Sequence, residues 1–189
     1  MFKLVLPSKD YEKDIFAYKQ EFVENGDSMD GCGSLDKYDT YDEWMNHIMQ
    51  YSDKNKIPPE SNYVEGSQYI LVRDYDNKIC GMVNIRHYLN DFLLESGGNI
   101  GYSIRPSERR KGYAKQQLKL ALDVCAKKGI RKVLLTCDKN NIGSAKTIKA
   151  NGGILEDERY SEIFKCILQR YWIQIWKKKK IKFMHIIIA

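Results

Sequence analysis

The sequence has 189 residues, 43% of them hydrophobic, which is enough for one domain with its own core and too little for two full domains. Its formal net charge of +6 is unevenly distributed: residues 1–65 hold 7 Lys and Arg against 14 Asp and Glu, residues 66–176 hold 19 against 11, and residues 177–189 add five lysines and no acid. Proteins that coat nucleic acid usually carry a basic excess across the folded domain, so this class is disfavoured and the second half suits a smaller anionic ligand.

The first half of the chain predicts one strand, two helices and a long loop between the helices. A strand is expected at Phe2–Leu6, and the apolar residues of 11–22 recur every three or four positions, as on one face of a helix. The loop at 27–39 is rich in Gly, Ser and Asp and is long enough to suggest a binding role. Thr40 and Glu43 form a capping-box pattern that opens the second helix.

The second half predicts strands and helices in alternation. We expect a hairpin of strands at 68–73 and 79–88, a strand at 99–104, a polar turn at 107–112, an amphipathic helix ending at 128–129, a strand at 132–137, a helix at 143–150, and strands near 154–158 and 163–176. This order predicts an α/β domain with α+β character and a parallel pair of strands at its centre, joined by a right-handed crossover.

The cysteines indicate the cellular compartment. There are five of them, an odd number without a CxxC pair and without close spacing to His, so we expect reduced thiols, no metal site and a cytoplasmic protein. The N-terminal apolar run is too short for a signal peptide. No stretch of the sequence reaches the roughly 18 apolar residues of a membrane span.

The most informative segment is the turn Arg109-Arg110-Lys111-Gly112-Tyr113-Ala114, between a strand and a helix. A helix N-terminus carries free amide N–H groups and about half a positive charge, so it binds phosphate where the backbone is accessible. Gly112 permits that approach, and the three cations before it favour a pyrophosphate. The turn lacks the Gly-Lys-Ser/Thr ending of a Walker A loop and the three glycines of a dinucleotide fingerprint.

This turn resembles the pyrophosphate loop of the GNAT superfamily of acyl-CoA-dependent N-acyltransferases, because Arg109-x-x-Gly112-x-Ala114 matches the family pattern Arg/Gln-x-x-Gly-x-Gly/Ala. Asn141 and Ser144 match the family's Asn after the fifth strand and the small residue three positions on. The run 101–109, together with 170–172, also resembles a group of uncharacterised predicted bacterial acetyltransferases, whose substrates this resemblance does not supply.

The resemblance implies a single GNAT-type domain over residues 1–176 and a basic C-terminal tail at 177–189 with a frayed end. The domain would have a mixed, mostly antiparallel sheet of about seven strands, with a splayed central parallel pair and helices on both faces. Acetyl-CoA would lie in the splay, and no metal is implied. The residues implied for its binding are Ser103, Ile104, Arg105, Arg109, Arg110, Lys111, Gly112, Tyr113, Ala114, Lys115, Asn141 and Ser144.

The implied activity is direct transfer of an acetyl group from acetyl-CoA to an amine. A backbone N–H near Ile104 or Arg105 would polarise the thioester carbonyl, and a base would remove a proton from the amine. Ile148 stands where many family members have the Tyr that protonates the departing thiolate, so the acid is unassigned. His87 and Glu95 are the weak candidates for the base, against a structural histidine and a solvated loop carboxylate.

The sequence does not name the acceptor amine. Trp44, Tyr51, Tyr63 and Tyr69 either wall its pocket or pack in the core, and the acidic side chains of the 27–39 loop either attract a cationic amine or are simply solvated. Cys137, which ends the central strand, is either a covalent nucleophile or, as we favour, a packed small hydrophobe.

Two other functions stay open at this point. The missing Tyr is compatible with a binding module that holds acyl-CoA without turnover. The lysine tail is compatible with nucleic-acid binding, although a frayed chain end is the explanation that we favour. We expect a small-molecule or peptide amine as the partner, no nucleic acid and no membrane span. A homodimer, frequent in the family, is left open.

Overall fold

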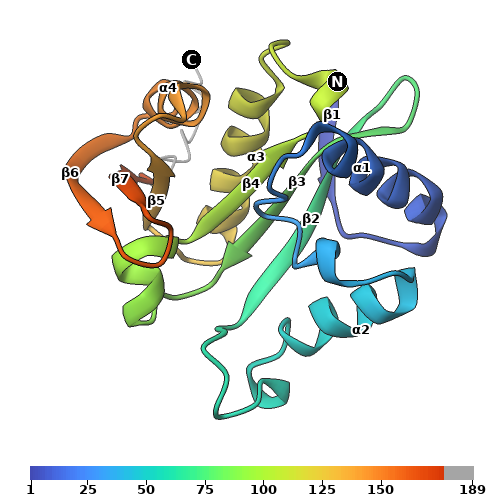
Figure 1. Ribbon diagram of the computed structural model, residues 1–189, viewed down its shortest axis with the longest axis horizontal. Coiled ribbons are helices and arrows are strands. Elements are labelled where there is room, and N and C mark those ends of the chain that lie inside the picture. The colour runs from blue at the N-terminus through green and yellow to red at the C-terminus, as the bar shows by residue number, and fades with distance from the viewer. Residues whose placement is uncertain (177–189) are drawn as a thin grey trace, which may run out of the picture.

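The computed structural model describes residues 1–176, and the predicted basic tail at 177–189 lies outside the described residues. The seven strands in this part form two sheets (Figure 1). All pairs within the two sheets are antiparallel. The first sheet has the order β1 (Phe2–Val5), β2 (Gly66–Arg73), β3 (Lys78–Arg86) and β4 (Ile100–Ile104), and the second has the order β5 (Lys132–Asp138), β7 (Cys166–Gln174) and β6 (Ile154–Ser161).

Helices cover both faces of the first sheet (Figure 1). The helices are α1 (Glu12–Asn25), α2 (Tyr41–Gln50), α3 (Tyr113–Lys127) and α4 (Ile142–Ala150). Shorter helical turns lie at Lys9–Tyr11, Leu35–Lys37, Lys54–Lys56, Leu93–Gly97 and Pro106–Glu108. α1 and α2 lie on one face of the sheet, α3 lies on the other, and α4 packs beside α3 and β5. No helix within residues 1–176 is both long enough and apolar enough to cross a membrane.

Two apolar cores separate these layers. Tyr18, Phe22 and Trp44 are fully buried in the core between the α1–α2 layer and the first sheet. Leu118 and Tyr171 are fully buried in the core that joins α3 and α4 to both sheets. Burial of such side chains is the main favourable contribution to folding. The helical spacing and strand alternation seen in the sequence arise from these two cores.

The strands divide into two sheets where one sheet of about seven strands was expected, and the expected splayed parallel pair is not confirmed. Within the described chain, β4 and β5 form no ladder, and the hydrogen bonds between their edges lie at Asn99, immediately before β4. The Asn99 N–H donates to Leu134 O at 2.7 Å, and Asn99 Oδ1 accepts from the Leu134 N–H at 2.9 Å. Gly98 allows this approach, since a Cβ there would lie 2.6 Å from Leu134 O. No ladder joins the two strands beyond this junction.

Candidate active site

The turn before α3 has the backbone of an anion site. Arg110 and Gly112 have φ values of +63° and +79°, and no side chain caps the N-terminus of the helix. A Cβ at Gly112 would meet no atom within 4 Å, so the approach to the turn is open. By contrast, Thr40 caps α2 in the predicted capping box and Asn141 caps α4. The first N–H groups of α3 are therefore available to a ligand.

Two of the cations expected on this turn are already paired. Arg109 Nη1 lies 2.5 Å from Asp27 Oδ2 at the end of α1, and Lys111 Nζ lies 2.9 Å from Glu108 Oε2. Neither side chain needs a ligand phosphate to balance its charge. The cations of the turn that form no ion pair within residues 1–176 are Arg110 and Lys115, which are exposed.

Glu108 is the centre of a buried charge cluster behind the turn. Its carboxylate lies 2.8 Å from Arg73, 3.1 Å from Lys78 and 2.9 Å from Lys111, and the side chain is only 5% exposed. Burial by itself raises the pKa of Glu108, but hydrogen bonds from Lys111, Lys78 and Arg73 outweigh it and hold the pKa at about 2. The cluster anchors the turn to β2 and β3 and keeps Lys111 in place.

Arg105 is also a structural anchor. Its guanidinium lies 2.6 Å from Asp14 and 2.6 Å from Glu21, both on α1, and its backbone N–H donates to Cys80 O at 3.0 Å. Since this N–H is already used, Ile104 is the better of the two predicted donors to a thioester carbonyl.

The backbone of β4 supports the choice of Ile104. Asn99 O accepts from the Arg86 N–H at 2.8 Å, and the Arg105 N–H donates to β3, so the odd-numbered residues of β4 bond to β3. Bonded and non-bonded directions alternate along an antiparallel strand. Tyr102 and Ile104 therefore turn their N–H groups away from β3, toward the gap between the two sheets.

The side chains of β4 form hydrogen bonds on both faces of the sheet. Ser103 Oγ contacts Tyr18 Oη at 3.0 Å and Cys32 Sγ at 3.2 Å on the α1 face. On the other face, Tyr102 Oη lies 2.9 Å from Ser144 Oγ, and burial raises the pKa of Tyr102 to about 12. The Asn141 carboxamide accepts from the Ser144 N–H at 2.9 Å. The two α4 residues expected at the cofactor site are thus linked to β4 through Tyr102.

Tyr102 is not among the residues that the sequence predicts for the site. The sequence does place Ile100, Tyr102 and Ile104 on one strand face, but nothing in it shows that the phenol reaches α4. Of the remaining predicted residues, Tyr113 packs its ring on Phe2, with ring centroids 4.5 Å apart, and Ala114 lies half-buried in the first turn of α3.

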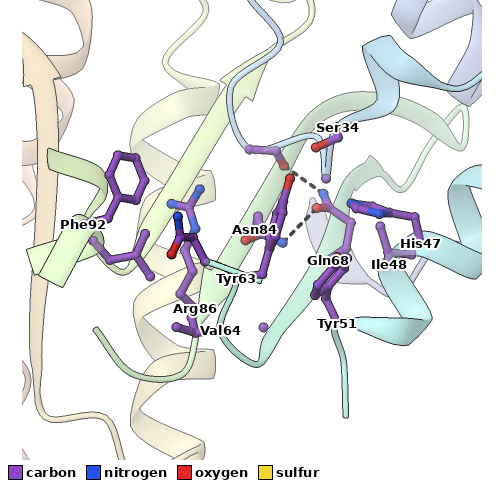
Figure 2. Close-up of a pocket in the computed structure, with 15 residues that line it drawn as sticks. Ser34, His47, Ile48, Tyr51, Tyr63, Val64, Gln68, Asn84, Arg86 and Phe92 are labelled. Atoms are coloured by element: carbon purple, nitrogen blue, oxygen red, sulfur yellow. Dashed lines mark hydrogen bonds between the residues drawn. The ribbon is translucent and has the colours of Figure 1, made fainter. Parts of the chain in front are cut away.

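A pocket of about 270 Å³ lies on the opposite face of the sheet from α3 (Figure 2). Its walls come from loop residues 31–34, from α2, from residues 62–64 and from the pair 92–93, and its floor comes from β2 and β3. Trp44 Nε1 donates to the carbonyls of Cys32 and Gly33 at 3.0 Å, which fixes the loop on α2. The long loop that the sequence predicted for a binding role therefore lines this pocket.

The aromatic residues proposed as pocket walls divide into two groups. Tyr51 and Tyr63 line the pocket with ring centroids 4.3 Å apart. Trp44 lies in the core under the loop, and Tyr69 packs with the α3-side core. His47, which in the sequence marks only a helix face, stands beside Tyr51 at 4.7 Å. Burial, together with the charge of Lys37, lowers the pKa of His47, so its imidazole is neutral at neutral pH.

The two candidate bases lie outside the pocket. His87 is bonded to Ser67 at 2.8 Å and lies 3.4 Å from Glu65; it shares the α3-side face of β3 with Val83 and Ile85, which pack in that core. Glu95 is exposed and forms an ion pair with Arg159 at 2.7 Å.

Two other kinds of chemistry find no support in the described residues. Burial raises the pKa of the Cys137 thiol to about 11, so this side chain is a protonated, packed thiol and no ready nucleophile. Within residues 1–176 no group of three or more His, Cys, Asp or Glu side chains is arranged to hold a metal ion.

The family assignment follows from the part of the chain that contains these features. Residues 36–152 match the family model described as the acetyltransferase (GNAT) family. The chain belongs to this family. The matched segment includes β4, the α3 turn and α4. The predicted family and the predicted enzyme class, a GNAT N-acetyltransferase, are therefore confirmed.

Solved structures agree on the fold. The GNAT chain aligns with the ribosomal-protein-S5-alanine acetyltransferase from Vibrio fischeri at a TM-score of 0.67 and 15% identity, covering 92% of each chain. It aligns with a dodecameric spermidine N-acetyltransferase from Vibrio cholerae at 0.63 and 17%, covering 92% and 93%, and with a microcin self-immunity acetyltransferase in complex with acetyl-CoA and AMP at 0.65 and 17%, covering 92% of each. No curated protein sequence matches the chain.

Proposed function

We propose that this GNAT protein transfers an acetyl group from acetyl-CoA to a primary amine by direct attack, with the amine bound in the pocket beside α2. The observation that carries the proposal is the uncapped N-terminus of α3, which follows β4 in the chain and is open to solvent at Gly112. The acceptors of the similar structures differ, from a protein alanine to spermidine, so they do not fix the acceptor here.

The residues of the turn fit the CoA pyrophosphate. An uncapped helix end needs an acceptor for its N–H groups, Gly112 leaves room for one, and Arg110 and Lys115, which form no ion pair within residues 1–176, can balance its charge. Because Arg109 and Lys111 are paired with Asp27 and Glu108, we assign pyrophosphate binding mainly to the backbone. Acetyl-CoA supplies the activated acetyl group when bound.

The remaining tasks fall to a backbone group of β4 and a side chain of the pocket. The Ile104 N–H, which points away from β3, is suited to stabilise negative charge on a carbonyl oxygen in the gap. Its position on a ladder-bonded strand means that no reorganisation is needed. Within the pocket lining, His47 is the residue whose neutral form can accept a proton from an incoming ammonium, directly or through water.

The test compares acetyl-CoA binding and CoA release in two matched glycine variants. Gly112 and Gly129 both have positive φ, +79° and +84°, and at both positions an added Cβ would meet no atom within 4 Å, so Asp causes similar backbone strain at each site. Gly112→Asp brings a carboxylate against the pyrophosphate, and we expect it to weaken acetyl-CoA binding by about 100-fold or more in calorimetric titration. Gly129→Asp, at the other end of α3, should bind like wild type.

Two outcomes would contradict the proposal. Equal acetyl-CoA affinity in wild type and Gly112→Asp would exclude the α3 turn as the pyrophosphate site. Acetyl-CoA binding with no CoA thiol released across a panel of amines would identify a binding module and exclude the proposed enzyme.

A further inference from the structure

The acceptor pocket contains a cation without a matching acid. Arg86, on β3, is the only Lys or Arg among the residues that line the pocket, and that lining includes no Asp or Glu. Within residues 1–176 its guanidinium forms no ion pair, and of the five N–H donors of a guanidinium it uses one, in a 3.4 Å bond to Gly97 O. Burial lowers the pKa of Arg86, and the charge of the exposed Asp30, which forms no salt bridge with it, only partly offsets this effect.

The Arg86 guanidinium packs against the backbone of β4 at Gly101. A Cβ at Gly101 would lie 3.1 and 3.2 Å from the two terminal nitrogens of Arg86, so the guanidinium lies directly over this glycine. Arg86 Nη2 forms no hydrogen bond within residues 1–176, yet it is not one of the fully buried polar atoms that lack a partner, so a ligand can reach it. A charged group that is partly desolvated and lacks a partner is costly, and a ligand anion would remove that cost.

The Asn84 carboxamide is a second polar group beside Arg86, and Gln68 fixes its orientation. Gln68 Nε2 donates to Gly31 O at 2.8 Å and to Tyr69 O at 3.3 Å, so Gln68 Oε1 is the atom turned toward Asn84 (Figure 2). It accepts from Asn84 Nδ2 at 3.2 Å. This network fixes the orientation of the Asn84 carboxamide and leaves Asn84 Oδ1, which forms no hydrogen bond within residues 1–176, to accept from a ligand N–H.

We propose that the acceptor is a small amine that also carries a carboxylate, held by a bidentate ion pair with Arg86 and by a hydrogen bond from its nitrogen to Asn84 Oδ1. Guanidinium and carboxylate match in geometry as well as charge. The pocket volume, about 270 Å³, is at the small end for ligand sites, and the rings of Tyr51, Tyr63 and Phe92 leave an apolar wall for the rest of the molecule.

This inference rests on the proposed function and narrows its substrate. Of the two explanations left open for the acidic side chains of the 27–39 loop, it favours simple solvation over attraction of a cationic amine. Asp27 is paired with Arg109, and Asp39 with Lys19 at 3.7 Å, and neither lines the pocket. A polyamine in this pocket would bring positive charge against Arg86 with no acid in the lining to offset it.

The experiment measures binding and turnover separately. Wild type saturated with CoA is titrated calorimetrically with a panel of amino acids and, for each, the matching amino-acid carboxamide. We expect at least one amino acid to bind 10- to 100-fold more tightly than its carboxamide, since hydrogen bonds to charged groups are worth about 1.5–3 kcal/mol. Acetyl transfer is followed by thiol release from acetyl-CoA with the same pairs, corrected for the fraction of neutral amine.

Three variants test whether the preference for an amino acid over its carboxamide depends on Arg86. Arg86→Gln should lower affinity for the amino acid to that for the carboxamide and leave CoA affinity unchanged. Gly101→Ala, which displaces the guanidinium and keeps its charge, should weaken the same preference and covers the case in which Arg86→Gln fails to fold. Arg159→Gln, which removes a guanidinium from the surface of β6, is the matched control and should behave like wild type.

The outcomes separate the two proposals. A panel in which no amino acid binds better than its carboxamide, or a preference that survives in both Arg86→Gln and Gly101→Ala, overturns the carboxylate inference. A preference for the amino acid that depends on Arg86 without any release of CoA supports the ligand class and refutes the enzyme. If polyamines are acetylated in preference to every amino acid, the proposed acetyltransferase activity stands and the proposal of a carboxylate-bearing acceptor is refuted.

Discussion

Substitution of Glu108 by Gln tests whether the charge cluster behind the α3 turn stabilises the fold. The three cations around the buried carboxylate hold its pKa at about 2, below its ordinary 4.5. A shift of this size corresponds to about 3 kcal/mol at about 1.4 kcal/mol per pKa unit. Lys78 and Lys111 are partly exposed and their share is screened, so we expect Glu108→Gln to lower the free energy of unfolding by about 2–3 kcal/mol at pH 7.

The stabilisation by ionised Glu108 depends on pH. Because the pKa of Glu108 is lower in the folded protein than in the unfolded chain, its stabilisation is fully present above about pH 4.5 and is lost as the pH falls through 2. Urea unfolding of wild type and Glu108→Gln at pH 7, 5 and 3.5 should therefore show a constant difference at the first two values and a smaller one at the third, with equal slopes.

A second Glu→Gln variant provides the control. Glu95 forms a single exposed ion pair with Arg159, and pairs of this kind contribute about 0–1 kcal/mol. If Glu108→Gln costs no more than Glu95→Gln at pH 7, the cluster does not stabilise the fold. If the loss in Glu108→Gln is as large at pH 3.5 as at pH 7, its origin is packing and the electrostatic account is wrong.

Two further substitutions address the sheet junction and the proton acceptor. Asn99→Ala leaves the buried Leu134 N–H without its acceptor, so the free energy of unfolding should fall by about 1–3 kcal/mol in urea titrations; a loss within error would mean that the side chain does not join the sheets. Burial lowers the pKa of His47 below the ordinary histidine value of 6.5, so in wild type we expect kcat/KM, corrected for the fraction of neutral amine, to fall only at a pH below 6.5, where His47 becomes protonated. The pH–rate profile of His47→Gln should lack this inflection. An inflection unchanged in His47→Gln would assign the proton transfer to another group.

The local structure was accessible from the sequence because it depends on neighbouring residues. Apolar spacing predicted α1 and the strands to within a few residues, and the capping box at Thr40 and the open glycine at 112 were both visible as short patterns. The turn before α3 could be placed for the same reason, since a helix N-terminus after a strand is a feature of the adjacent chain alone.

The partners of the turn could not be found in this way. Asp27 lies at the end of α1 and Arg109 lies far along the chain beyond β4, and only the packing of α1 on the sheet brings them to 2.5 Å. Only the acid at Arg109 is distant in the sequence, since Glu108, the partner of Lys111, lies three residues away in the same turn. The division of the strands into two sheets also depends on tertiary contacts, among them the hydrogen bonds of Asn99 to Leu134.

The pocket leaves only a weak signal in the sequence. Asn84 and Arg86 are polar residues two positions apart in a strand that is otherwise mostly buried, and Gln68 stands opposite Asn84 in the neighbouring strand. Polar side chains in register on one sheet face mark a site, because burial without a partner is costly. The register between β2 and β3 was needed to read that signal.

The gap beside β4 gives this strand an unusual position among sheet edges. An exposed edge offers free backbone groups that other chains can pair with, and it is a common route to aggregation. Here the edge of β4 beyond Asn99 lies inside the domain, facing the second sheet and linked to α4 through Tyr102. The fold thus leaves one sheet edge unpaired while the second sheet and α4 shield it from pairing with other chains.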